Sequence, residues 1–221
     1  MEAQLIKGAT YFYKLEAKRW LGLHGEDDPV SEVEYNPTLG PVYNYLKMIQ
    51  RRLDQETDYC RRYHLPVQST LIQFRKLTLE RLLADHLPRV ILEPRTGLAI
   101  LAKENNYDGV RLLYTLTGSD IPNGHDLMAR AFAKVIRDEG RATAEEFKTM
   151  HELSITSKSS GKGKDKAVED GGASTQGATI ALRWVENVLL LKQRYDSIWK
   201  HALNSDRFFQ IRFDEVRYLH S

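Results

Sequence analysis

The clearest pattern in the chain is the recurrence of apolar residues at helical spacing between Val42 and His64. Val42, Leu46, Ile49, Leu53 and Cys60 share one face, and charged residues occupy the others. This spacing predicts one long amphipathic helix. At 1.5 Å per residue it would reach on the order of 35 Å, longer than the usual helix of a compact domain. The pattern therefore favours an elongated architecture.

The same periodicity recurs along most of the chain. It predicts a second long helix from Ile180 and helices over Leu5–Leu21, Ser69–Leu82, Leu98–Asn105, Tyr107–Leu116 and His125–Glu139, with a short helix through Phe208 and Phe213. The short apolar run Arg89–Glu93 fits a helix or a strand, and no other segment has a convincing strand pattern. The expected fold class is all-α, an elongated bundle of long helices.

Breaks in the pattern divide the chain. Gly140 is expected to cap the helix before it, and Thr143–Glu146 resembles a capping box that opens another helix. Residues 155–177 are rich in Ser, Gly, Lys, Asp and Glu and lack aromatic residues, which predicts a solvated, disordered linker. The expected organisation is a helical bundle over 1–154, a linker over 155–177, and a further helical unit over 178–221.

Composition narrows the function classes. The 221 residues include 32 Lys and Arg against 30 Asp and Glu, so the net charge is +2. A protein that only binds nucleic acid is usually much more basic than this. No apolar run approaches the roughly 18 residues needed to cross a bilayer, so no membrane association is expected. The single cysteine, Cys60, and the absence of a signal-peptide pattern at the start indicate a cytoplasmic or nuclear protein.

The sequence contains no complete motif for catalysis, metal binding or phosphate binding. No two of the seven histidines have the helical spacing of a metal site, and Ile155 stands where the second histidine of a zinc-protease motif would follow His151-Glu152. Gly161–Lys164 resembles a phosphate loop, but Asp165 replaces the required hydroxyl residue. Cys60 is expected to be a structural cysteine of the long helix and not a reactive thiol. We expect no catalytic, metal-binding or cofactor-binding residues and no cofactor.

Two arginine pairs offer a binding alternative. Arg51, Arg52, Arg61 and Arg62 lie on one predicted helix, the first and last of them eleven residues apart, and could contact phosphate or an acidic partner. Intervening acids favour an ordinary solvated face with ion pairs. The tryptophans Trp20, Trp184 and Trp199 are more simply helix-packing residues than partner anchors. A helical nucleic-acid or polyanion binding protein is therefore the alternative reading, and nucleic acid is the less favoured partner.

The order of several short motifs resembles that of the cullins. The family pattern Tyr-Leu…Arg-Leu…Glu is matched at the long helix, and a His-Leu pair, a Tyr-x-Leu helix, a Pro-x-Gly turn and an Asn-x-Asp-x-Phe segment follow in family order. The matching residues are Tyr45, Leu46, Arg52, Leu53, Glu56, Tyr63, Ser69, Thr70, His86, Leu87, Asp108, Tyr114, Leu116, Ile121, Pro122, Gly124, Glu139, Gly140, Leu190, Lys192, Tyr195, Asp196, Asn204, Asp206 and Phe208. The turn at Ile121–Gly124 and the segment Asn204–Phe208 are most similar to cullins that use BTB-domain adaptors.

This resemblance implies a non-catalytic scaffold of a ubiquitin ligase, linked to ubiquitin-dependent protein catabolism. In the family a stiff stalk of helical repeats holds a substrate adaptor at one end and a RING subunit at the other, so partners would be proteins such as BTB adaptors or the RING subunit. By resemblance, residues 1–154 correspond to the second cullin repeat and 178–221 to the start of the next. The family's adaptor-binding and RING-binding regions have no counterpart in these residues, so no protein-binding residue is assigned, and the expectation is a truncated cullin.

Overall fold

The computed structural model describes residues 2–22, 40–62, 68–118, 120–159 and 172–217. Its helices are α1 (Glu2–Trp20), α2 (Pro41–Arg62), α3 (Gln68–Leu82), the 3-10 turn η3 (Ala84–His86), α4 (Leu87–Leu92), α5 (Leu98–Lys103), α6 (Tyr107–Leu116), α7 (Gly124–Ser159), α8 (Gly172–His201) and α9 (Arg207–Arg217). These ranges contain no strand. The expectation of an all-α fold is confirmed.

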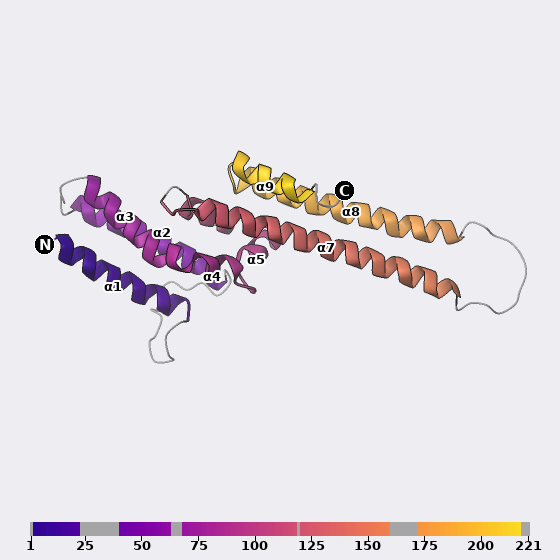
Figure 1. Ribbon diagram of the computed structural model, residues 1–221, viewed down its shortest axis with the longest axis horizontal. Coiled ribbons are helices and arrows are strands. Elements are labelled where there is room, and N and C mark those ends of the chain that lie inside the picture. The colour runs from indigo at the N-terminus through magenta and orange to yellow at the C-terminus, as the bar shows by residue number, and fades with distance from the viewer. Residues whose placement is uncertain (1, 23–39, 63–67, 119, 160–171, 218–221) are drawn as a thin grey trace, which may run out of the picture.

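The helices are arranged along one long axis (Figure 1). Helices α1, α2 and α3 form one end, and α4, α5 and α6 lie in the middle. The hairpin of α7 and α8 runs from the middle to the opposite end, and α9 turns back beside the first half of α7. Helix α7 has 36 residues, so it alone spans about 54 Å.

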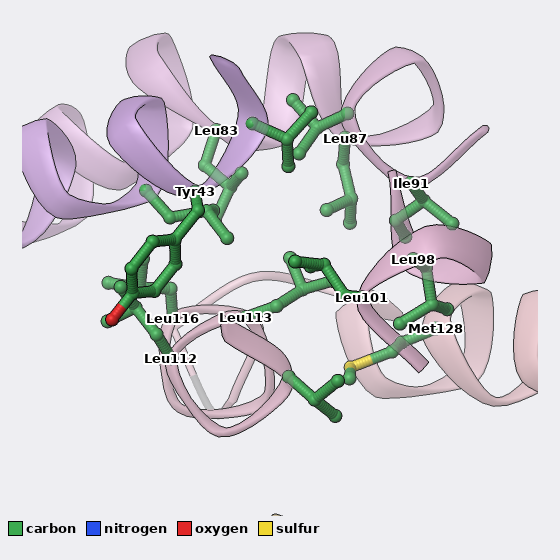
Figure 2. Packing of buried hydrophobic residues seen from close by; sticks show 14 of the residues in the cluster. Tyr43, Leu83, Leu87, Ile91, Leu98, Leu101, Leu112, Leu113, Leu116 and Met128 are labelled. Carbon is green, nitrogen blue, oxygen red and sulfur yellow. The ribbon is translucent and has the colours of Figure 1, made fainter. Parts of the chain in front are cut away.

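A single core joins the α1–α3 bundle to the start of the hairpin. Figure 2 shows Tyr43 of α2, Leu83 and Leu87 after α3, Leu113 of α6 and Met128 of α7 around one apolar centre. Leu83, Leu113 and Met128 have no solvent exposure. Burying a side chain of this size stabilises a fold by about 1.5–3 kcal/mol. Because α7 contributes to the same core as α2, the long hairpin is anchored in the bundle at its first turns.

Two of the helix ends expected from the sequence are wrong, and both lie inside α7. Gly140 does not end a helix, and Thr143–Glu146 does not open one, because α7 continues unbroken through both positions. Extending an existing helix adds one hydrogen bond per ordered residue, whereas a new helix needs a costly nucleus. The cost of about 1 kcal/mol for a helical glycine is therefore smaller than the cost of stopping and restarting.

The bounds of the expected linker also need correction. Helix α7 runs to Ser159 and α8 begins at Gly172, so both ends of the segment 155–177 are helical. The middle of that segment, including Gly161–Lys164, lies outside the described residues. The ambiguous run Arg89–Glu93 belongs mostly to α4, where Val90 and Ile91 are buried. The described helices α2 and α6 agree closely with the ranges expected from periodicity.

Candidate functional site: the helix junction and the exposed helix faces

The described residues hold no group of three or more His, Cys, Asp or Glu side chains that could bind a metal ion. His86, His125 and His201 lie on separate elements. Cys60 is buried at the end of α2, and burial, followed by the charge of Glu56, raises the pKa of its thiol. A thiol with a raised pKa is a poor nucleophile at neutral pH. The expectation that Cys60 is a structural residue agrees with this environment.

The four arginines of α2 do not form one uncommitted basic face. The guanidinium of Arg52 binds Glu16 of α1, with Nε 2.9 Å from Oε1, and lies over the Phe12 ring at 5.2 Å from its centroid. Arg61 lies 3.7 Å from Asp58 on its own helix. The sequence could not reveal the Arg52 pair because its partner lies 36 positions away in the chain.

Helices α1 and α2 are held together by polar side chains over a shared support. Both helices pack on α3. The Tyr13 hydroxyl donates a hydrogen bond to Glu56, beside the Arg52–Glu16 pair, and burial followed by this hydrogen bond raises the pKa of Tyr13. The Tyr45 hydroxyl donates to the carbonyl of Leu82 at the end of α3. These contacts fix the angle between the first three helices.

The junction of α6, α7 and α9 is organised around Tyr114. Its ring stacks on His125 of α7 with centroids 4.5 Å apart and meets Phe209 of α9 edge-on at 5.6 Å. Its hydroxyl donates to Asp206 Oδ2 at 2.9 Å. Burial, followed by this hydrogen bond, raises the pKa of Tyr114 to about 12. One side chain therefore connects the consecutive helices α6 and α7 to the segment that opens α9, since Asp206 lies 92 positions from Tyr114.

Asp206 joins the end of α8 to the start of α9. Its Oδ1 accepts a hydrogen bond from the Phe208 backbone N–H at 2.8 Å, and its carbonyl accepts one from Trp199 Nε1 at 2.9 Å. Asn204 and Ser205 before it have positive φ angles, 52° and 55°, which let the chain reverse within a few residues. Asp206 and Tyr114 both belong to motifs that resemble cullins, and the structure brings these motifs together.

The turn before α7 is equally constrained. Asn123 has a φ of 58°, and a Cβ on Gly124 would lie 2.4 Å from the carbonyl oxygen of Thr117. Only glycine fits at this close approach. The Ile121–Gly124 turn therefore sets the direction in which α7 leaves the bundle.

Further along, the hairpin is held by side-chain pairs between its two helices. Arg194 of α8 lies 3.1 Å from Glu139 of α7, and the rings of Phe147 and Trp184 are 5.4 Å apart. Around and between these contacts α8 exposes apolar side chains at helical spacing, including Leu182 (65% exposed) and Leu189 (58%). No other described helix lies beside this distal half (Figure 1).

These contacts hold the helices at fixed angles and leave their outer faces exposed. Such faces offer surfaces on which other proteins can dock.

None of the described helices combines the length and the apolar character needed to cross a membrane. The described residues do not include three of the histidines and three of the lysines, namely His24, His64, His220, Lys162, Lys164 and Lys166.

Both a family model and a curated protein are similar to this chain. The family model described as the cullin alpha solenoid domain matches residues 1–217. Cullin-3 of Schizosaccharomyces pombe (strain 972 / ATCC 24843) is 24% identical over 197 residues, which cover 89% of this chain and 21% of that protein. The chain thus spans about a fifth of the length of this curated relative.

Proposed function

The chain belongs to the cullin family, and from this premise we propose that it acts as a stiff, non-catalytic spacer within a ubiquitin ligase. Cullins are helical scaffolds linked to ubiquitin ligases. Our proposal adds that this chain contributes to ubiquitin-dependent protein catabolism by fixing a distance between bound proteins. Holding two reactants at a productive separation lowers the entropic barrier of their reaction without any chemical group from the spacer.

The observation that carries the proposal is the anchoring of α7. This 36-residue helix begins at the constrained Gly124 turn, contributes Met128 to the central core, and is joined to α9 through the Tyr114 contacts. A helix fixed at one end by a packed core and by specific hydrogen bonds transmits its direction over its full length. Stiffness of this kind is what a spacer requires.

We further propose that its partners are subunits of ubiquitin ligases in the cytoplasm or nucleus. BTB proteins are the first candidates. Their support comes from two segments that are most similar to cullins that use BTB adaptors, the turn Ile121–Gly124 and the segment Asn204–Phe208. Both segments are structural in this chain, since Asp206 and Gly124 serve the junction. The docking residues for such a partner are therefore sought on the exposed helix faces.

Affinity purification tests the proposal. The chain, tagged and expressed in its own cells, is crosslinked and purified, and its partners are identified by mass spectrometry beside a tag-only sample. A Phe209→Ala/Phe213→Ala variant, which removes the α9 rings that contact Phe132 of α7, serves as a structurally weakened control. We expect BTB proteins, a RING subunit or another cullin with the unchanged chain and a reduced yield of them with the variant. Recovery of none of these proteins by a well-folded chain would contradict the proposed function.

A further inference from the structure

The outward face of α1 carries a row of cations around an exposed aromatic ring. Lys7, Tyr11, Lys14 and Lys18 follow one another at spacings of four, three and four residues, so they lie on one side of the helix. Tyr11 is 68% exposed, Lys7 and Lys14 are exposed, and Lys18 is half-buried. Within the described residues, no salt bridge involves any of the three lysines.

Nearby groups strengthen the positive charge of this face. Glu16, the acid of α1 closest to the row, is already bound by Arg52. At the end of the helix, Arg89 donates a hydrogen bond to the Leu21 carbonyl. Burial lowers the pKa of His86, and the charges of Arg89 and Lys18 lower it further against the opposing effect of Asp85. Lys18 therefore lies in a neighbourhood that contains Arg89 and also the carboxylate of Asp85.

A largely apolar groove lies at the N-terminal end of the row, next to Gly8. It has a volume of about 570 Å³, and its lining residues are Gln4, Gly8, Ala9, Gln55, Glu56, Tyr59 and Phe74. A Cβ on Gly8 would meet no heavy atom within 4 Å, so α1 presents an open, flat spot where another backbone can approach closely. Helices that dock in grooves use this combination of close approach and a recess for apolar side chains.

We propose that this surface, the α1 docking face (Lys7, Gly8, Tyr11, Lys14 and Lys18), binds an acidic amphipathic helix of a partner protein. An apolar side chain of that helix enters the groove beside Gly8, and its carboxylates pair with the three lysines. The carboxylate of Glu56 in the groove wall disfavours nucleic acid or a lipid surface, whose negative charge is evenly spaced. A helix can instead place an uncharged residue opposite Glu56. This site goes beyond the spacer function and does not depend on it.

Fluorescence anisotropy with a designed peptide tests the site. The probe is an 18-residue labelled helix with leucines on one face and glutamates beside them, and a peptide of the same composition in scrambled order is the control. We expect Lys7→Glu/Lys14→Glu/Lys18→Glu to weaken binding of the probe at least tenfold. The matched variant Lys103→Glu/Lys134→Glu/Lys200→Glu makes the same charge change at exposed lysines elsewhere and should alter binding less than twofold.

Several outcomes would overturn the proposal. Equal losses in the two triple variants, or equal binding of the scrambled peptide, would mean that only general charge attraction operates. Stronger binding of a polyuridine 20-mer than of the probe would mean that the site binds a nucleic acid and not an acidic helix. Stronger binding of phosphatidylserine vesicles would mean that it binds a membrane surface. The chain's own sequence contains an acidic stretch with Glu26, Asp27, Asp28, Glu32 and Glu34. If neutralising those five residues increased binding of the probe more than tenfold, that stretch rather than a partner would be the occupant.

Discussion

Two glycines of the same helix show how much a single residue position depends on its surroundings. Gly124 opens α7 with its α-carbon against the Thr117 carbonyl, whereas Gly140 lies in the helix interior, where an added Cβ would meet nothing within 4 Å. Both belong to motifs that resemble cullins, yet only one of them is required by the backbone. The glycine at 140 is a local weak point of the long helix, because a helical glycine costs about 1 kcal/mol relative to alanine.

This contrast predicts opposite effects of the same substitution. Gly140→Ala should increase the free energy of unfolding by about 0.5–1 kcal/mol, because it restricts the unfolded chain and adds no clash. Gly124→Ala should decrease it by about 1–3 kcal/mol, because the methyl group would press on the Thr117 carbonyl. Urea denaturation followed by circular dichroism measures both. A loss of stability in Gly140→Ala, or none in Gly124→Ala, would contradict the described geometry of α7.

A second residue-scale effect concerns acid. Burial lowers the pKa of His86 in the folded state below its usual value near 6.5. As pH falls through that value, the unfolded chain binds a proton that the folded chain binds only at lower pH, so stability is lost. Above the usual value, both states are neutral at this position and the effect is absent.

The matching experiment compares the melting temperature of the unchanged chain with that of His86→Gln between pH 7.5 and pH 5.5. We expect the unchanged chain to lose more stability over this interval than the variant, since glutamine does not titrate. His86 makes no side-chain hydrogen bond as the N-cap of α4, so the substitution removes no cap. Parallel pH profiles for the two proteins would exclude His86 as the source of acid sensitivity.

At the scale of elements, periodicity predicts the helices well and their ends less well. The apolar repeats of α2 and α6 gave their bounds closely, because each has a buried face that fixes the pattern. The predicted helix end at Gly140 and the predicted helix start at Thr143–Glu146 are both wrong, because α7 continues through them. Extension of an existing helix outweighs a local capping preference. Caps compete with packing, and the sequence alone does not show which side of a helix is packed.

The contacts between elements were largely beyond prediction. The sequence motifs placed Tyr114 and Asp206 in separate segments, and their hydrogen bond joins positions 92 residues apart. The pairing of Arg52 with Glu16 likewise needed the fold, and it changed the interpretation of an apparent basic cluster. Order along the chain thus identifies the family pattern, but proximity of the motifs follows only from the packed helices.

The hairpin itself should differ in stability along its length. Its first half contains Met128 and Phe132, both without solvent exposure, whereas Leu153, Leu182 and Leu189 of the distal half are largely exposed. Regions with few buried apolar contacts open with lower free energy. We expect amide hydrogens of residues 141–155 and 180–190 to exchange faster than those of 125–139. Equal protection in these segments, measured by hydrogen exchange and mass spectrometry, would mean that the distal helices are stabilised by contacts not seen in a single chain.

At the scale of the whole molecule, the proposed spacer function depends on one fixed distance between the two ends. The bundle of α1, α2 and α3 meets the hairpin through the central core, and the Tyr114 junction joins α6 to α7 and α9, so α7 is held near its start. A cullin-like spacer needs this relation to persist in solution, because a hinge at the junction would spread the distances between bound proteins. The end-to-end distance is therefore the quantity on which the proposed function rests.

Double electron–electron resonance between spin labels at the two ends tests this relation most directly. Labels are attached in a Cys60→Ala background to Gln73→Cys on α3 and Glu186→Cys on α8, both at exposed positions. A second pair, Gln73→Cys with Gln50→Cys within the bundle, measures the width contributed by the labels themselves. We predict one end-to-end distance with a distribution nearly as narrow as that of the control pair. A broad or multiple distribution for the end-to-end pair alone would show a hinge at the junction and contradict the spacer.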